Sequence, residues 1–233
     1  VISYIASLEN YNKYLPTIEK MISSLEIFTQ SVKSETYTQE TATQIIDQLL
    51  TPVTINASAL GNERSNLTIV EFGDYQCPNC AQFHKETKDT LIQNFVDTGK
   101  VKFIFKDFIV NDLPSDRAST LAAEASYCAA EQGRYWDYHD ELYRNSKGEN
   151  TGWVTKDNLK QFANNIMVPD LIKFSGCVES HKYSSLVTEN DNLARTIGLT
   201  GTPTFILYNG TTPIAIQGAY PYQVFDQVIN EMT

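Results

Sequence analysis

The stretch Phe72-Gly-Asp-Tyr-Gln-Cys-Pro-Asn-Cys-Ala-Gln-Phe-His84 places Cys77 and Cys80 two residues apart. The run Leu67–Phe72 before the pair is short and rich in β-branched and aromatic residues, as expected for a buried strand. Apolar residues recur at helical spacing after Cys80, and a second strand-like run follows at Val101–Phe105. The order of strand, Cys-x-x-Cys turn, helix and strand is the context in which this spacing indicates a thioredoxin-like redox motif.

The spacing of the two cysteines suits thiol chemistry at the start of a helix. Unpaired backbone N–H groups and the helix dipole favour a thiolate on the first cysteine. The second sulfur reaches back to close a small disulfide and to release a substrate held as a mixed disulfide. Pro78 suits the first helical turn. We therefore expect Cys77 to be the exposed attacking thiol, Cys80 to be the resolving thiol, and the two to form the redox-active disulfide.

A metal site and an ordinary structural disulfide are the alternatives for this pair. A zinc site would combine Cys77, Cys80 and His84 with a further cysteine, but the usual second pair of closely spaced ligands is absent. We therefore expect no metal and no bound cofactor, and we expect His84 to be packed or solvated along the helix. His139 and His181 have no evident partner. The aromatic cluster of Tyr135, Trp136, Tyr138 and Tyr143 is expected to form a local core.

Composition and charge narrow the class of protein. The chain has 233 residues, of which 42% are hydrophobic and 20% charged, and this composition is typical of a globular protein. The formal net charge of -10 disfavours nucleic acid as a partner, because its recognition needs a basic surface. The apolar runs are too short to span a membrane. Since the chain begins at Val1, we expect that a signal peptide or membrane anchor has been removed and that the protein works outside the cytoplasm.

The periodicity of apolar residues predicts three parts. Residues 1–52 form an N-terminal helical extension, with helical runs around Ile18–Val32 and Ile45–Leu50. Residues 53–112 and 200–233 form one α/β domain, which ends with strands at Thr204–Tyr208 and Ile214–Gln217 and a helix at 222–232. Residues 113–199 form an inserted helical domain. Its predicted helices cover 118–132, 135–145, 156–166, 169–179 and 183–197.

Three blocks together resemble the DsbA-type thiol:disulfide oxidoreductases of the thioredoxin superfamily. They are Val70–Cys80, Ala129–Trp136 and the block Gly198-Leu-Thr-Gly-Thr-Pro-Thr-Phe205. The resemblance runs from about Val53 to the C-terminus and leaves out the N-terminal extension. It implies an α/β thioredoxin-like fold with an inserted helical domain.

The same resemblance implies roles for particular residues. Pro203 is expected to be the cis-proline of a loop that faces the redox pair, with Thr202 before it; a trans proline that opens an edge strand is the alternative. Pro78, Asn79 and Thr202 are expected to contact the substrate, which can pair as an extended strand with the backbone of this loop.

Glu71 matches the buried acidic residue of the family, which accepts or delivers the proton of Cys80. Lys106, at the end of the second strand, is a hypothetical charge partner that would avoid an unpaired buried carboxylate. A lysine exposed at the strand end is the alternative for this position.

Cys128 and Cys177 remain, and we expect them to form a structural disulfide because members of this family are usually exported. Such a bond would close a loop of 49 residues. Two buried free thiols are the alternative.

The expected function is a thiol–disulfide oxidoreductase. We favour an oxidase that introduces disulfides into unfolded or reduced polypeptides and that is recharged by a membrane partner of the DsbB or vitamin-K-epoxide-reductase type. The motif lacks the histidine of the best-known DsbA pair, and Thr202 also occurs in isomerase-like relatives. Isomerase or reductase activity therefore stays open, as does a noncatalytic chaperone or adaptor. The oligomeric state is not determined by the sequence.

Overall fold

The computed structural model of the chain describes residues 39–52 and 59–233. Contacts divide the chain after Ala42, and the unit Thr43–Thr233 is described by itself. The helical run expected around Ile18–Val32 lies outside the described residues. The second predicted run forms helix α3 (Gln39–Leu50). None of the helices in the described ranges is long and apolar enough to cross a membrane.

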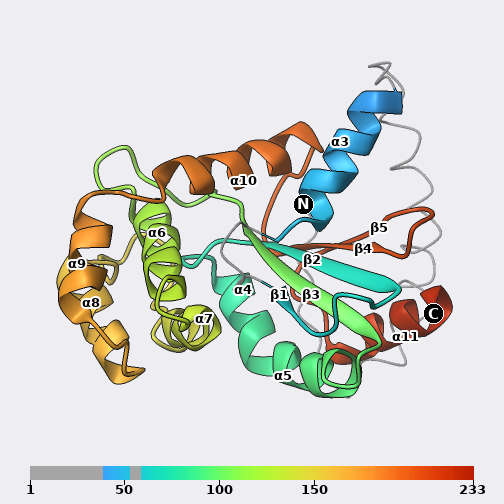
Figure 1. Cartoon of the computed structure of the whole chain (residues 1–233), viewed down its shortest axis with the longest axis horizontal. Coiled ribbons are helices and arrows are strands. Elements are labelled where there is room, and N and C mark those ends of the chain that lie inside the picture. The colour runs from blue at the N-terminus through green and yellow to red at the C-terminus, as the bar shows by residue number, and fades with distance from the viewer. Residues whose placement is uncertain (1–38, 53–58) are drawn as a thin grey trace. The chain divides into compact units, whose positions relative to one another are not determined.

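A five-stranded sheet in the order β1-β3-β2-β4-β5 supports the rest of this unit (Figure 1). The middle strands β2 (Leu67–Gly73) and β3 (Val101–Asp107) run parallel, and β4 (Thr204–Tyr208) pairs antiparallel with β2. The edges are β5 (Ile214–Gln217) and the two-residue β1 (Ala59–Leu60). Because almost every residue of β2 and β3 is buried, both strands are largely apolar runs and could be predicted from the sequence.

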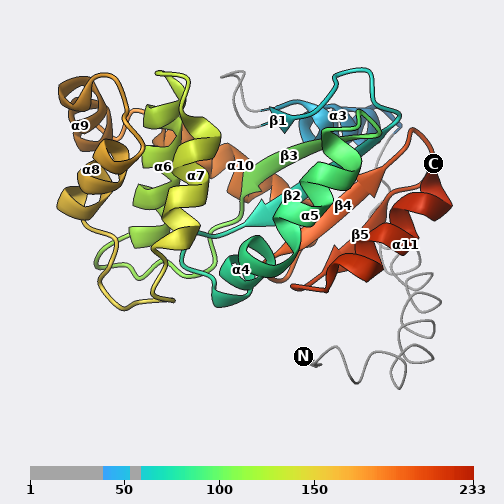
Figure 2. The same ribbon diagram turned by 90° about the horizontal axis from the view of Figure 1, so that it is seen from below.

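The two faces of the sheet are covered by different helices. Successive side chains of a strand point to opposite faces. Ile69 packs with residues of the helix after the redox motif and of α11 (Tyr222–Met232). Val70, the next residue, packs with residues of α10 (Ser184–Thr196) and with Leu49. Figure 2 shows α4, α5 and α11 in front of the sheet and α10 behind it.

The helix that follows Cys77 contains two π-helical segments. It consists of α4 (Pro78–Phe83), η4 (His84–Lys88), α5 (Asp89–Leu91) and η5 (Ile92–Val96). The apolar spacing predicts a single helix and carries no signal for the wider turns. Such turns are rare and frequently occur at functional sites.

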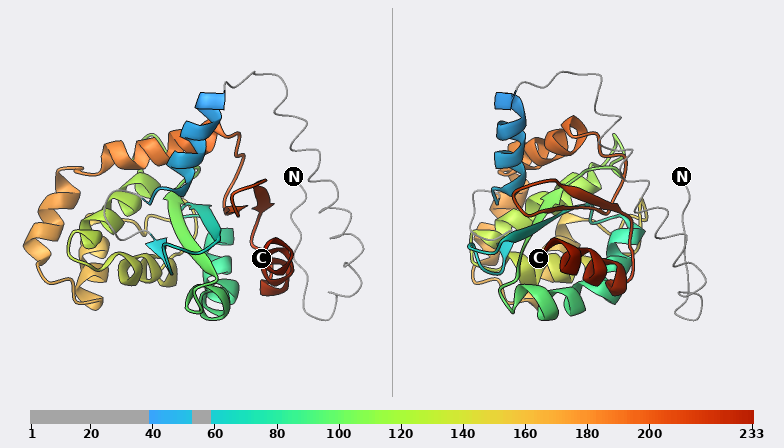
Figure 3. Two further views of the ribbon diagram at one scale, coloured as in Figure 1. Left: turned by 45° about the vertical axis from the view of Figure 1, so that its right-hand side comes forward. Right: turned by 90° about the vertical axis from the view of Figure 1, so that its right-hand side faces the viewer.

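Five helices lie between β3 and β4 and form the inserted region (Figure 3). They are α6 (Ala118–Ala130), α7 (Tyr135–Arg144), α8 (Lys156–Asn165), α9 (Leu171–Glu179) and α10. Each agrees with a predicted stretch to within a few residues. The predicted fold class, an α/β thioredoxin-like fold with an inserted helical region, is confirmed.

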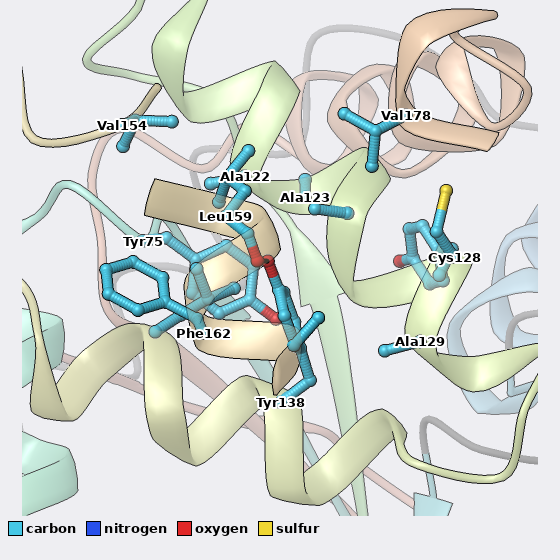
Figure 4. Packing of buried hydrophobic residues seen from close by; sticks show 14 of the residues in the cluster. Tyr75, Ala122, Ala123, Cys128, Ala129, Tyr138, Val154, Leu159, Phe162 and Val178 are labelled. Atoms are coloured by element: carbon cyan, nitrogen blue, oxygen red, sulfur yellow. Dashed lines mark hydrogen bonds between the residues drawn. The ribbon is translucent and has the colours of Figure 1, made fainter. Parts of the chain in front are cut away.

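Tyr75, in the loop after β2, enters the core of the insert (Figure 4). Tyr138 of α7 and Leu159 of α8 belong to the same buried cluster, as do the small residues Ala122 and Ala123 of α6. The insert is therefore packed directly against the loop that carries the redox motif.

A disulfide links helices α6 and α9 of the insert. Cys128 and Cys177 are both buried, and their Cα atoms are 5.8 Å apart. The structure thus contains the bond that the sequence led us to expect.

Candidate active site

Cys77 occupies the N-cap position of α4, and Pro78 occupies its first turn. The carbonyl of Cys77 accepts a hydrogen bond from the N–H of Ala81 at 3.1 Å. A proline is tolerated at this position because an N–H of the first turn would have no helical partner. Both Cys77 and Cys80 are free thiols in this structure. The sulfur of Cys77 therefore lies where backbone N–H groups and the helix dipole stabilise a negative charge.

Burial distinguishes the two thiols less than expected. Cys77 is 6% exposed and Cys80 is 0% exposed. The prediction that Cys77 is an exposed thiol is wrong, because the loop before β4 lies against it. The carbonyl of Thr202 accepts a hydrogen bond from the Cys77 thiol at 3.4 Å. Pro78 and Asn79, in contrast, are exposed beside the pair.

The pKa values of the two thiols shift in opposite directions. A hydrogen bond from the Cys80 thiol is the main reason why the pKa of Cys77 is lowered from 9.0 to about 7, although burial opposes the shift. Burial raises the pKa of Cys80 well above 9.0, and the neighbouring Cys77 and Glu71 add to the rise. This asymmetry fits an attacking Cys77 and a resolving Cys80.

The loop that faces Cys77 contains a cis peptide bond between Thr202 and Pro203. The carbonyl of Pro203 accepts a hydrogen bond from the N–H of Gly218 at 2.8 Å, which ties the loop to the end of β5. The hydroxyl of Thr202 is buried and has no hydrogen-bond partner among the described residues. The backbone of this loop thus lies within hydrogen-bond reach of the attacking sulfur.

Glu71 is fully buried on β2, on the face that carries α4. Neither of its carboxylate oxygens has a hydrogen-bond partner within the described part of the chain. Burial raises the pKa of Glu71 from 4.5 to about 8; Lys88 opposes the rise, and Cys77 and Asp140 add to it. At neutral pH this carboxyl group is therefore mostly protonated and is able to donate a proton.

Lys106 is not the charge partner of Glu71, and that prediction is wrong. In the parallel register, Glu71 stands opposite Phe105, whereas Lys106 stands opposite Phe72. Neighbouring residues of a strand point to opposite faces, so Lys106 lies on the far face of the sheet. Its ammonium group donates a hydrogen bond to the carbonyl of Thr51 at 2.9 Å. The alternative of an exposed lysine is also wrong, since Lys106 is only 3% exposed.

A series of buried polar side chains connects Glu71 with the insert. His84 begins η4, and its Nε2 atom lies 3.8 Å from Oε2 of Glu71. The same nitrogen lies 3.1 Å from Nε2 of His139 on α7. Nδ1 of His139 lies 2.8 Å from the hydroxyl of Tyr75. His139, for which the sequence indicates no partner, thus has two.

Nδ1, the other nitrogen of His84, faces Asp140, which is the polar group of this series nearer to solvent. Nδ1 of His84 lies 3.9 Å from Oδ1 of Asp140, whose side chain is 37% exposed. The ammonium group of Lys88 binds the same oxygen at 2.5 Å. The His84 ring stacks on Tyr143, with ring centroids 3.9 Å apart and an interplanar angle of 21°. Burial lowers the pKa of both His84 and His139 well below 6.5, so both rings are neutral.

The aromatic cluster predicted on α7 serves two purposes. Tyr135 and Tyr138 are buried in the core of the insert, as predicted. Tyr143 belongs to the same core but also forms the stacking surface for His84, and Trp136 makes edge contacts with His139. The third histidine, His181, lies elsewhere and pairs with the buried Glu124.

Among the described residues, one group could hold a metal ion by its geometry. It consists of His84, His139 and Asp140, whose candidate ligand atoms lie within 4.8 Å of one another. Lys88 already supplies a positive charge to Asp140, and the two histidines hydrogen-bond to each other. A zinc site made of Cys77, Cys80 and His84 does not occur as such a group in these residues.

The sequence is similar to those of known proteins. Residues 54–218 match the family model described as thioredoxin. The chain is 30% identical over 149 residues to disulfide bond formation protein D of Bacillus subtilis, a match that covers 62% of this chain. The matched part spans 64% of the length of that relative.

Two solved structures have similar folds. The crystal structure of oxidised BdbD from Bacillus subtilis aligns with a TM-score of 0.69 and 24% identity, over 78% of this chain and 95% of that one. The crystal structure of α-DsbA1 from Wolbachia pipientis aligns with a TM-score of 0.68 and 20% identity, over 80% of this chain and 94% of that one.

Proposed function

Because the chain belongs to the thioredoxin family, we propose that it is a thiol–disulfide oxidoreductase that works through Cys77 and Cys80. The observation that carries this proposal is the asymmetry of the two thiols. Cys77, at the start of α4, has a pKa lowered to about 7, whereas burial raises the pKa of Cys80 well above 9.0. A nucleophile that ionises near neutral pH beside a second thiol is what disulfide exchange requires.

In the oxidising direction, the reaction begins with a disulfide between Cys77 and Cys80. A substrate thiolate attacks the sulfur of Cys77, which forms a mixed disulfide and releases Cys80 as a thiolate. The Cys80 thiolate takes the proton of Glu71, whose pKa of about 8 keeps it protonated at neutral pH. A second substrate thiolate then attacks the substrate sulfur of the mixed disulfide. The substrate leaves with a new disulfide, and the enzyme is left with two reduced cysteines.

The surroundings of Cys77 support a role in substrate binding for four residues. Pro78 and Asn79 are exposed beside the pair, and the Thr202 carbonyl already accepts a hydrogen bond from the Cys77 thiol. The loop that contains Thr202 and cis-Pro203 would bind an extended substrate segment by hydrogen bonds between the two backbones.

The direction that we favour is disulfide donation to reduced or unfolded polypeptides. Stabilising the thiolate of Cys77 stabilises the reduced enzyme, and a stable reduced form makes the disulfide a stronger oxidant. The name of the Bacillus subtilis relative supports this direction. The reverse reaction, as a reductase or isomerase, is the second candidate because the Cys77–Cys80 motif lacks the histidine of the best-known DsbA pair, which is one possible stabiliser of the thiolate.

We further propose that the protein works outside the cytoplasm. The Cys128–Cys177 bond supports this, because buried disulfides persist in oxidising compartments. A membrane redox partner of the DsbB or vitamin-K-epoxide-reductase type would restore the Cys77–Cys80 disulfide after each turnover.

The test is oxidation of a reduced, unfolded protein by the oxidised chain, followed by alkylation and mass spectrometry. We expect the wild type and the double variant Cys128→Ala/Cys177→Ala to form disulfides in the substrate. Cys77→Ala should form none. A wild type that oxidises the substrate no faster than the buffer does would overturn the proposal.

A further inference from the structure

Glu71 has no direct route to solvent for its proton. It is fully buried, and neither oxygen has a hydrogen-bond partner among the described residues. If Glu71 gives its proton to Cys80, as the proposed function requires, the reduced protein is left with a buried carboxylate that takes up a proton again at neutral pH, because its pKa is about 8. Titratable and charged groups from four segments surround Glu71 and His84. They are Lys88 of η4, Tyr135, His139, Asp140 and Tyr143 of α7, Tyr75 of the loop after β2, and Cys77 and Cys80 at the start of α4.

His84 joins the buried carboxyl group to one that is open to solvent. Its Nε2 atom lies 3.8 Å from Glu71 Oε2, and its Nδ1 atom lies 3.9 Å from Asp140 Oδ1. The Glu71 side chain is 0% exposed and the Asp140 side chain is 37% exposed. Each gap is about 1 Å longer than a hydrogen bond, so a small side-chain movement closes it.

We propose that His84 is a proton relay that reloads Glu71 from solvent through Asp140, an inference that rests on the proposed function. A proton enters at Nδ1 of His84 from the Asp140 side, and the proton on Nε2 passes to the carboxylate of Glu71. One proton is taken from solvent for each proton that Glu71 has given to Cys80. In the reverse reaction the same path carries the proton of Cys80 outwards. His84 acts through Glu71 and is therefore a positioning residue rather than a catalytic one.

The hydrogen bonds of His139 allow His84 to carry its proton on either nitrogen. When Tyr75 donates to Nδ1 of His139, Nε2–H of His139 donates to Nε2 of His84, and the proton of His84 is on Nδ1. When Nδ1–H of His139 donates to Tyr75, Nε2–H of His84 donates to His139. Each transfer moves the proton of His84 from Nε2 to Nδ1, and Nε2 then accepts a hydrogen bond from His139. The neutral ring regains its first form between turnovers by losing the Nδ1 proton to solvent and taking up another at Nε2.

The surroundings hold His84 in the neutral form that such a relay uses. Burial lowers its pKa well below 6.5, and Lys88 lowers it further. Stacking on Tyr143 fixes the plane of the ring, so that one nitrogen faces each carboxyl group. Lys88 binds Asp140 and keeps that carboxylate at the outer end of the path.

The experiment measures rate and equilibrium separately in the full-length chain. The protein is turned over many times with reduced glutathione and a small-molecule disulfide as oxidant, so that Glu71 loses and regains its proton repeatedly. The steady-state rate is recorded, and samples quenched with acid are analysed by mass spectrometry for the mixed disulfide and the reduced pair. Variants are His84→Ala and His84→Phe, which keeps a ring against Tyr143. The control is Asp137→Asn, which removes a carboxylate that lies on α7, as Asp140 does, but pairs with Arg134. The equilibrium constant against glutathione is measured for each.

We expect both His84 variants to react at least tenfold more slowly than wild type, with equilibrium constants that change less than twofold. Asp137→Asn should match wild type in both quantities. Added imidazole should restore the rate of His84→Ala in proportion to its concentration. Pyrrole, a ring of the same size without a basic nitrogen, should not.

Three results would overturn the relay while leaving the proposed function intact: an unchanged rate in both His84 variants, a rate and an equilibrium constant that change together, or rescue by pyrrole as effective as rescue by imidazole. If the wild type forms no mixed disulfide with glutathione, the proposed function itself fails and the relay fails with it.

Discussion

Glu71 stands opposite Phe105 in the parallel register of β2 and β3, so the next residue of β3, Lys106, points to the other face of the sheet. The carboxyl group beside the two cysteines is therefore not paired with Lys106, and burial holds its proton although Lys88 opposes this. Several properties of the protein depend on this arrangement, because the group that we propose to exchange protons with Cys80 is uncharged at neutral pH.

Replacing Glu71 with Gln should change how stability depends on pH. The folded-state pKa of Glu71 is about 8, above its ordinary value of 4.5, so the folded chain holds a proton that the unfolded chain loses between these values. The wild type should lose stability relative to Glu71→Gln as pH rises from 4.5 to 8, by up to about 5 kcal/mol. Urea denaturation of both reduced proteins across this range measures the difference. A difference that does not vary with pH would contradict the assigned burial.

Replacing Lys106 with Met should leave disulfide exchange unchanged. Lys106 is separated from Glu71 by the sheet and binds the carbonyl of Thr51. We expect the rate with glutathione and its pH dependence to match wild type, while the stability changes by about 1 kcal/mol through the lost hydrogen bond. The comparison is with Glu71→Gln, which should slow the exchange. If Lys106→Met exchanged disulfides with glutathione more slowly than wild type, Lys106 would have to interact with Glu71 after all.

Removing Cys80 should raise the pKa of Cys77. The Cys80 thiol is the largest cause of the lowered pKa of Cys77, so in Cys80→Ala this pKa should move from about 7 toward its ordinary value of 9.0. The rate of alkylation by iodoacetamide as a function of pH reports this pKa as its midpoint. Asn79→Ala is the matched control, because it keeps both the Cys80 thiol and the backbone N–H groups. Equal midpoints in Cys80→Ala and wild type would disprove the hydrogen bond between the thiols.

Removing the disulfide of the insert should affect stability and spare the chemistry. The bond closes a loop of 49 residues, which corresponds to about 4 kcal/mol in the chain-entropy model. Cys128→Ala/Cys177→Ala should therefore unfold at a lower denaturant concentration. Its exchange rate with glutathione should equal that of wild type. An unchanged denaturation midpoint would show that the bond does not stabilise the native state.

The parts of the fold that could be predicted from the sequence are those with a strong local signal. The buried strands β2 and β3 are short runs rich in β-branched and aromatic residues, and the helices of the insert have clear apolar spacing. The sequence predicts that α9 starts at Pro169, whereas its first residue in the structure is Leu171 and Asp170 is its N-cap. The carboxylate of Asp170 accepts hydrogen bonds from two backbone N–H groups, which fixes the boundary.

The parts that could not be predicted depend on contacts between distant segments. The sequence predicts that Lys106 pairs with Glu71, because both lie near the ends of neighbouring strands. The register that separates them depends on how the two strands pair and cannot be predicted from either strand alone. His84 and His139 meet only because α7 packs against η4, and no local pattern brings together two residues that are 55 positions apart. The 6% exposure of Cys77 likewise depends on the loop at Thr202.

The reduction potential of the Cys77–Cys80 pair decides between disulfide donation and reduction. It is measured in glutathione buffers, while mass spectrometry monitors the state of Cys128 and Cys177. A disulfide donor should have a potential near the oxidising end of the thioredoxin superfamily, about -120 mV as in DsbA. A potential near about -270 mV, as in thioredoxin, would contradict disulfide donation and make reduction the function of this site.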